Sequence, residues 1–226
     1  MSEPLDRPVW SALTSSQAQL AVATGAAVRI DPAYGPFAAA CDASDEAQAA
    51  LIATLRGPDD CIGVVEREAW PTPSGTRVLG GGDLVQMVLE RLADAPDDPR
   101  VVPLGENDVL EMAELALATE PGPWSSGTHR YGQFYGIRIG GRLAAMAGER
   151  MRVPGFVEVS GVCTWPEFRG QGLAAALIRR VARGLIAHGD TPFLHSYAAN
   201  VRAIALYESL GFRTRAGMTF TILALA

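Results

Sequence analysis

The order of the predicted elements indicates an α/β protein built on a mixed, mostly antiparallel sheet flanked by helices. Two observations favour this fold class. Residues 131–164 alternate like strands and are divided by glycine turns, which predicts a three-stranded antiparallel meander. The meander runs directly into a glycine-rich turn and a long amphipathic helix, after which a strand, a helix and a last strand follow. The residues before this region predict a further, N-terminal α/β accessory domain.

Composition limits the classes of protein to consider. A chain of 226 residues is long enough for one large or two small domains with a real core. A net charge of −6 disfavours a nucleic-acid scaffold, because phosphate contacts need a basic surface. No basic leader precedes an apolar run, and no apolar stretch approaches the ~20 residues of a membrane span, so we expect a cytoplasmic protein.

Neither a disulfide framework nor a zinc pattern is visible, since the cysteines and histidines are scattered along the chain. They are Cys41, Cys61, Cys163, His129, His188 and His195.

The first part of the chain predicts helices and short strands without a chemical motif. The expected elements are a helix within 1–27, a strand at 28–30, a turn at 34–37, a helix at 42–56, a strand at 61–66, a turn-rich loop at 71–82 and a strand, or alternatively a helix, at 84–92. The first helix is expected to begin at a cap among Thr14, Ser15 and Ser16 and to end at Gly25. The polar segment 94–100, twice broken by proline, is the best candidate for a domain boundary.

The second part predicts a regular series of elements. These are a strand at 101–104, a helix from Asn107 or Asp108 to about 118, an irregular segment at 120–128, strands at 131–139, 142–152 and 156–164, a helix with Leu173, Leu177, Val181 and Leu185 on one stripe, a strand at 193–197, a helix at 201–210 and a strand at 218–225.

The segment Glu158–Ala174 carries the first motif. It changes from a β-rich run into a glycine turn and then a helix, which aims backbone N–H groups and the positive end of a helix dipole at one point. This arrangement predicts a pyrophosphate site. A P-loop is excluded because Gly172 is followed by Leu173 and not by lysine. A dinucleotide fingerprint is disfavoured because Asp190 stands before the next strand and not after it.

A second motif follows downstream. Asn200, Ala203 and Tyr207 are followed by Gly211-Phe212. Asn200 is a good N-cap and Gly211 a good residue to end a helix, so a helix of about ten residues fits between them. One face of this helix then carries an amide, a small residue and a phenol.

The pattern Arg169-x-x-Gly172-x-Ala174 and the second motif, at their spacing, resemble the two signatures of the GNAT superfamily of acetyl-CoA-dependent N-acetyltransferases. The resemblance covers about residues 101–226. It implies a GNAT domain at 99–226 and an accessory α/β domain at 1–98, whose element order also fits a degenerate GNAT-like half. It further implies acetyl transfer from acetyl-CoA to a primary amine by direct attack in a ternary complex, without a metal.

The resemblance also implies which residues hold acetyl-CoA. Glycines at 170 and 172 would let backbone N–H groups approach the phosphates, and a strand around 162–164 would splay from its neighbour at a bulge on Gly161 and offer free N–H groups. The implied cofactor-binding residues are Val162, Cys163, Thr164, Arg169, Gly170, Gln171, Gly172, Leu173, Ala174, Asn200, Ala203 and Tyr207.

Two residues are implied as catalytic. Tyr207 would act as the acid that protonates the departing sulfur, as in the family. Glu158 would act as the base, since it precedes Arg169 at the offset used by histone-type acetyltransferases. A carboxylate inside an apolar run is costly unless it is paired or used, and we expect its pKa to be raised.

Alternatives for the base are Glu149 on the adjacent strand, His195 and a water relay. A covalent acetyl-enzyme on Cys163 is disfavoured because buried cysteines are usually inert. The partners implied are a small-molecule or peptide amine, with no nucleic acid and no membrane, while a homodimer stays open. The alternative function is a catalytically inactive acyl-CoA-binding sensor or interaction protein.

Overall fold

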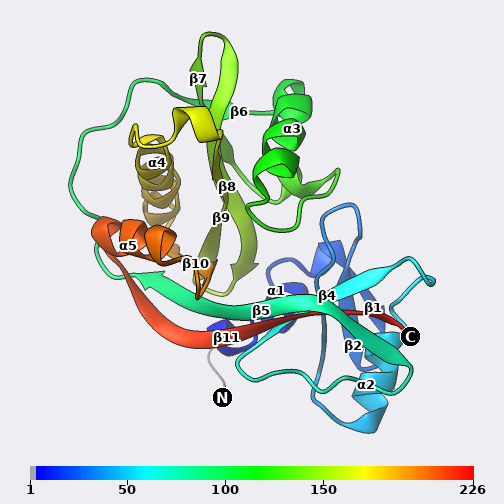
Figure 1. Ribbon diagram of the computed structural model, residues 1–226. Coiled ribbons are helices and arrows are strands. Elements are labelled where there is room, and N and C mark those ends of the chain that lie inside the picture. Colours follow the sequence, from blue (N-terminus) through cyan, green and yellow to red (C-terminus); the bar gives the residue numbers. More distant parts are fainter. Residues whose placement is uncertain (1–3) are drawn as a thin grey trace.

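An eight-stranded mixed sheet forms the centre of the protein in the computed structural model, which describes residues 4–226 (Figure 1). Its strands, in spatial order, are β4 (Cys61–Glu66), β11 (Phe212–Leu225), β5 (Thr76–Leu89), β10 (Thr191–Tyr197), β9 (Phe156–Thr164), β8 (Arg142–Val153), β7 (Phe134–Ile139) and β6 (Val101–Leu104). Neighbouring strands are antiparallel except for the parallel pair β9 and β10. The predicted fold class, a mixed and mostly antiparallel sheet flanked by helices, is confirmed.

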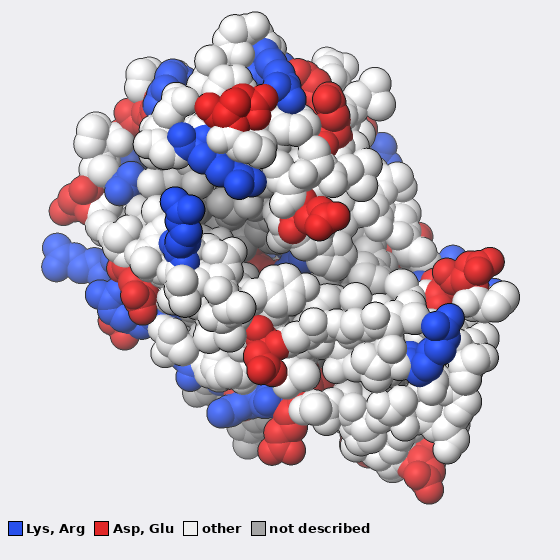
Figure 2. Space-filling model, in the orientation of Figure 1, with Lys and Arg blue, Asp and Glu red and all other residues white. Residues whose placement is uncertain are grey.

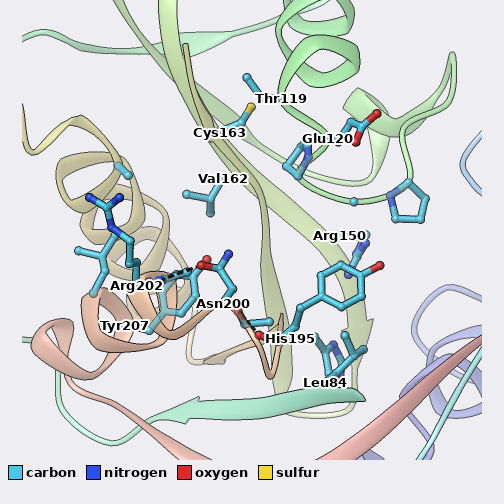
Figure 3. Close-up of a pocket in the computed structure, with 18 of the residues that line it drawn as sticks. Leu84, Thr119, Glu120, Arg150, Val162, Cys163, His195, Asn200, Arg202 and Tyr207 are labelled. Atoms are coloured by element: carbon cyan, nitrogen blue, oxygen red, sulfur yellow. Dashed lines mark hydrogen bonds between the residues drawn. The ribbon is translucent and has the colours of Figure 1, made fainter. Parts of the chain in front are cut away.

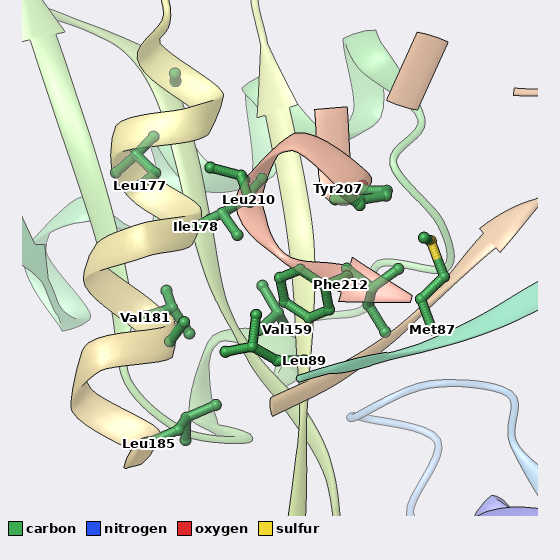
Figure 4. Packing of buried hydrophobic residues seen from close by; sticks show 14 of the residues in the cluster. Met87, Leu89, Val159, Leu177, Ile178, Val181, Leu185, Tyr207, Leu210 and Phe212 are labelled. Atoms are coloured by element: carbon green, nitrogen blue, oxygen red, sulfur yellow. The ribbon is translucent and has the colours of Figure 1, made fainter. Parts of the chain in front are cut away.

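Helices cover both faces of the sheet. α4 (Leu173–Ala187) and α3 (Val109–Thr119) lie on opposite sides of strands β7 to β9, and α5 (Val201–Leu210) lies near α4 (Figure 1). The predicted stripe on α4 is buried and packs against Val159, Leu210 and Phe212 (Figure 4). Each such side chain removed from water contributes about 1.5–3 kcal/mol, which fixes α4 firmly on the sheet.

The N-terminal part contributes to two sheets. β1 (Ala21–Thr24), β2 (Ala27–Ile30) and β3 (Ala38–Ala40) form a small antiparallel sheet with α1 (Pro8–Leu13) and α2 (Asp45–Ile52) packed nearby. β4 and β5 instead join the large sheet, where β5 lies between β10 and β11. The hydrogen bonding of the large sheet therefore runs across the proposed boundary at residues 98 and 99. The division into domains 1–98 and 99–226, and the degenerate half, stay predictions.

Short 3-10 helices connect the larger elements. They span Pro4–Asp6, Ala18–Leu20, Glu106–Asp108, Thr128–Arg130 and Pro166–Phe168.

The prediction of a first helix that ends at Gly25 is wrong. The first helix comes earlier, with Pro8 in its first turn where a missing N–H costs nothing. The residues before Gly25 form strand β1 instead, and Gly25, with φ +55°, turns the chain into β2. Pairing of β1 with β2 has overridden the local signals from the serine and threonine residues. The second helix is also shorter than predicted, since Ser44 caps it and it ends at Ile52.

The loop predicted at 71–82 is wrong in its second half, because β5 already begins at Thr76. β5 pairs with β11 along nearly its whole length, and β11 likewise begins six residues earlier than predicted, at Phe212 and not at 218. The glycines that predicted a loop permit this close pairing. A Cβ on Gly81 would lie 2.0 Å from the carbonyl oxygen of Phe220.

No helix within residues 4–226 has the length and apolar character needed to cross a membrane.

Gly211 offers a test of the helix end beside the second motif. It has φ +102°, and an added Cβ would lie 1.8 Å from the carbonyl oxygen of Arg91. We expect Gly211→Ala to lower the free energy of unfolding by more than about 2 kcal/mol, through backbone strain and this clash. Urea denaturation measures the loss. Gly217→Ala is the control, since no atom lies within 4 Å of its added Cβ. Equal losses in both variants would contradict this account.

Candidate active site

A cavity of about 430 Å³ opens where strands β9 and β10 separate (Figure 3). The two strands pair only from Phe156 with Thr191 to Glu158 with Phe193. Beyond that point they diverge, and Val162, Cys163 and Thr164 of β9 face the cavity opposite His195, Ser196 and Tyr197 of β10. Figure 2 shows the surface hollowed at this place, with arginines along its rim, since the chain has no lysine.

The bulge predicted at Gly161 is present. Gly161 has φ +61°. Met146 of β8 pairs with Cys163 of β9, but Gly148 pairs with Ser160, so the register of the two strands shifts at this point. A bulge leaves backbone groups of one strand unpaired and turns them out of the ladder. Together with the divergence from β10, it makes the backbone around Val162 available to polarise a carbonyl group in the cavity.

The glycine turn before α4 is open to an approaching ligand. Gly170 and Gly172 have φ of +77° and +74°, and no atom lies within 4 Å of a Cβ added to either residue. No side chain caps the start of α4. The N–H groups and the dipole of this helix end are thus free for an anion, and this cradle fits the pyrophosphate of a bound coenzyme.

Most of the residues predicted to hold acetyl-CoA lie around this one cavity. Those in its lining are Val162, Cys163, Thr164, Arg169, Ala174, Asn200, Ala203 and Tyr207. Gly170, Gln171 and Gly172 are exposed in the adjoining turn, whereas Leu173 is buried in the core and outside the lining. The two motifs, separated by a helix and a strand in the sequence, therefore meet in space.

The helix of the second motif forms as the sequence predicts. The Asn200 side chain accepts a hydrogen bond of 3.2 Å from the Ala203 N–H, and Gly211 ends α5 in the left-handed conformation. Tyr207 projects from α5 into the cavity lining, 91% buried, with its ring edge-on to Phe212 at 6.2 Å. Burial raises the pKa of the Tyr207 phenol to about 12, so it carries its proton at neutral pH.

Glu158 is fully buried and all its oxygen atoms are engaged. Arg150 donates from Nε to Oε2 and from Nη2 to Oε1, both at 2.8 Å. His195 Nδ1 lies 2.7 Å from Oε1, and the Met151 N–H donates to Oε2 at 3.4 Å. The carboxylate is not part of the cavity lining. It joins β9 to β8 and β10, and the geometry favours a positioning role over that of a base.

The pKa predicted for Glu158 is wrong in direction. Burial alone would raise the pKa of this carboxyl, but the charge and hydrogen bonds of Arg150 and the hydrogen bond of His195 lower it overall. A carboxylate with a lowered pKa is a weak proton acceptor at neutral pH. The sequence suggested the opposite because the partner of Glu158 stands on another strand.

His195 is also fully engaged. Its Nδ1 faces Glu158, and its Nε2 lies 3.1 Å from Nε2 of Gln86. The Gln86 oxygen accepts from Arg215, so its nitrogen is the atom that donates to His195. With Glu158 at Nδ1 and Gln86 at Nε2, neither ring nitrogen is left to act as a base.

Glu149 and Cys163 fit the chemistry less well than the sequence allowed. Glu149 lies outside the cavity lining, and Arg152 holds one of its oxygens at 3.3 Å. Burial raises the pKa of the Cys163 thiol to about 12, so it is protonated and a poor nucleophile.

Sequence reasoning missed the other end of the cavity. Its walls include Phe37, Val65 and Leu84 from the N-terminal part, together with Phe220, Tyr197 and Arg150. No local motif marks these residues.

Within residues 4–226, no group of three or more His, Cys, Asp and Glu side chains is arranged to hold a metal ion.

Comparisons with known proteins agree with this geometry. The family described as FR47-like protein matches residues 134–221. A protein from Novosphingobium aromaticivorans, described as belonging to the GNAT family of acetyltransferases, is 59% identical, with a TM-score of 0.95 and full coverage of both chains. No curated protein matches the chain.

More distant structures share the fold. A GCN5-related N-acetyltransferase from Kribbella flavida has a TM-score of 0.61 at 18% identity, with 95% of each chain covered. A GCN5-related N-acetyltransferase-like protein from Streptococcus suis has a TM-score of 0.62 at 15% identity, with 95% of this chain and 92% of that chain covered.

The surroundings of Glu158 lead to a stability prediction. Glu158→Gln leaves the Arg150 charge uncompensated, and we expect it to lower the free energy of unfolding by about 3 kcal/mol or more at pH 7. Because the pKa of Glu158 is lowered in the folded state, the ionised carboxylate stabilises the folded protein at pH values above about 4.5. This stabilisation is lost as the pH falls below 4.5, so the difference in free energy of unfolding between the variant and wild type should shrink there. Thermal unfolding across this pH range measures it.

Glu149→Gln is the matched control, because Arg152 holds its carboxylate only at 3.3 Å and its side chain is 16% exposed, against 1% for Glu158. It should cost under about 1 kcal/mol. A Glu158→Gln variant as stable as wild type, with turnover that recovers at high pH, would instead make Glu158 the base.

Proposed function

Because the chain belongs to the GNAT family of acetyltransferases, we propose that it is an N-acetyltransferase that moves an acetyl group from acetyl-CoA to a primary amine of a small molecule or peptide. The observation that carries this proposal is the cavity at the divergence of β9 and β10, where residues of both motifs meet. One end offers a backbone cradle for phosphates, and the other is closed by side chains of several strands.

Acetyl-CoA supplies an activated thioester when it is bound. The glycine turn and the start of α4 hold its phosphates through backbone N–H groups, and Arg169 in the cavity lining adds a charge-assisted contact. The backbone of β9 beside the Gly161 bulge donates to the carbonyl oxygen and stabilises the charge that develops there.

Tyr207 provides the proton that the leaving group needs. As the amine nitrogen bonds to the carbonyl carbon, the carbon–sulfur bond breaks, and the Tyr207 hydroxyl gives its proton to the sulfur. A pKa of about 12 keeps this phenol protonated throughout the physiological range. The phenolate then regains a proton from solvent.

The proton of the amine leaves through water in this proposal. Glu158 and His195 have no free atom to accept it, and Glu149 lies outside the cavity lining. The protonated Cys163 thiol favours direct transfer in a ternary complex over an acetyl-enzyme. We further propose a cytoplasmic location and no nucleic-acid or membrane partner.

The cofactor cradle is tested by Gly172→Val. We expect acetyl-CoA to bind at least about 10-fold more weakly, because a side chain blocks the approach of phosphate to the backbone. Calorimetry measures the affinity. Gly155→Val is the control, since Gly155 has a similar φ of +79° and equally open space but lies in the turn between β8 and β9. Unchanged affinity in Gly172→Val would remove this loop from the site.

The role of Tyr207 is tested by Tyr207→Phe. We expect turnover to fall by about 10²-fold or more, while acetyl-CoA affinity changes little, because the phenol acts as the thiolate forms. Thiol release with a panel of amines measures the rate, and Tyr135→Phe on β7 is the control. Wild-type turnover would exclude Tyr207 as the acid. If acetyl-CoA binds but no amine of the panel causes release of the CoA thiol, the protein is an acyl-CoA-binding sensor instead.

A further inference from the structure

A half-buried arginine, Arg150 of β8, stands across the cavity from the residues of the second motif. Figure 3 shows Tyr207 and Asn200 on one side of the view and Arg150 on the other. The Arg150 side chain is 13% exposed and belongs to the cavity lining. The proposed mechanism gives this cation no task.

The Arg150 guanidinium is held in a fixed orientation. Glu158 takes one edge through two hydrogen bonds of 2.8 Å, from Nε and Nη2. The ring of Phe37 packs against the group, with its centroid 4.9 Å from Cζ. Both contacts exist without a ligand, so the arginine is already arranged for whatever it binds.

Part of the hydrogen-bonding capacity of Arg150 is unused. A guanidinium has five N–H donors, and Glu158 takes two. Within residues 4–226, no side chain or carbonyl group accepts from the other three, which include both donors on Nη1. The Arg150 side chain is 13% exposed and lines the cavity, so a group with oxygen atoms placed beside it there would accept hydrogen bonds from these donors.

The unused donors match a carboxylate. Nη1 and the second N–H of Nη2 form a planar fork, which fits two carboxylate oxygens better than a single carbonyl oxygen. The charges around the cavity also favour an anion. Glu158 balances Arg150, but the two other arginines of the lining, Arg169 and Arg202, outnumber its single carboxylate, Glu120. Arg169 lies in the glycine turn and Arg202 on α5, at the end of the cavity proposed for acetyl-CoA. Arg150 lies at the other end, where it can meet the acceptor.

The walls near Arg150 are apolar. The lining here consists of four apolar side chains and one tyrosine: Phe37, Val65, Leu84, Phe220 and Tyr197. Such walls accept a hydrophobic or aromatic group and reject a second charge, because burying an unpaired charge is costly.

We propose that Arg150 binds the carboxylate of the acceptor, and that the acceptor is an amino acid with an apolar or aromatic side chain. This inference rests on the proposed function, since it names the substrate class of the same cavity. The carboxylate would hold the amino group toward the thioester end of the cavity.

Three related acceptors test the substrate class: L-phenylalanine, L-phenylalaninamide and phenethylamine. They share the amine and the ring and differ in the carboxylate. We expect kcat/KM from thiol release to be about 10- to 100-fold higher for the acid than for the other two, because a charged hydrogen-bond pair is lost in each. L-leucine should follow L-phenylalanine, and L-aspartate should be a poor acceptor.

A binding measurement tests Arg150 without turnover. N-acetyl-L-phenylalanine and its amide are titrated by calorimetry into the full chain with CoA, and the acid should bind at least about 10-fold more tightly. The double variant Arg150→Gln with Glu158→Gln removes both charges together, which avoids an unpaired buried ion. It should lose the preference for the acid yet keep its affinity for acetyl-CoA. Arg152→Gln is the control, since this arginine of β8 bonds Asp190 outside the cavity lining.

The outcomes separate the two proposals. Equal binding of acid and amide by the wild type, or a preference that survives in a folded double variant, overturns the role of Arg150. Faster transfer to phenethylamine than to the acid overturns the substrate class and leaves acetyl transfer intact. Failure to bind acetyl-CoA overturns the proposed function, and the titration of acid against amide still decides whether Arg150 binds a carboxylate.

Discussion

The buried hydrogen bonds of Glu158 hold together the point at which β9 and β10 part. Glu158 and Phe193 form the last backbone pair between these strands. Two residues further along β10, His195 reaches the Glu158 carboxylate at 2.7 Å, so side chains link the strands there. Arg150 ties the same carboxylate to β8. These contacts replace the backbone ladder just where it ends, so the cavity can open without loosening the sheet.

The same hydrogen bonds extend into the N-terminal part of the chain. Gln86 of β5 is the register partner of His195 and is fully buried. Its amide donates to His195 and to the carbonyl oxygen of Leu5, and its oxygen accepts from Arg215. A buried polar group needs all these partners, so the site depends on β5 and on the backbone at Leu5. The N-terminal part therefore supplies walls of the cavity and also anchors its base.

The sequence predicted the local structure of the glycine turn and of α5 well, because both are built from local features. A glycine turn, a helix start and a capped helix are each encoded within a few neighbouring residues, and α5 begins and ends where Asn200 and Gly211 indicate. The acceptor end could not be predicted in this way. Phe37, Leu84 and Phe220 come from three distant segments. The pairing of β5 with β11 brings Leu84 and Phe220 together, and a backbone bridge to Gly63 of β4 places Phe37 beside the same sheet. The role of Glu158 was misjudged for the same reason, because the irregular register of β8 and β9 decides that Arg150 meets it.

In the proposed function the two ends of the cavity would recognise their ligands by different physical means. Backbone N–H groups at the glycine turn would bind phosphate through their position and the helix dipole, so glycine and helix geometry suffice there. At the other end, Arg150 is balanced by Glu158, which leaves little net charge but a rigid set of unused donors. Such a group discriminates by the shape of the oxygen pair it meets more than by charge alone. Because Glu158 also secures the divergence of β9 and β10, a single carboxylate connects the opening of the cavity with the orientation of the arginine inside it.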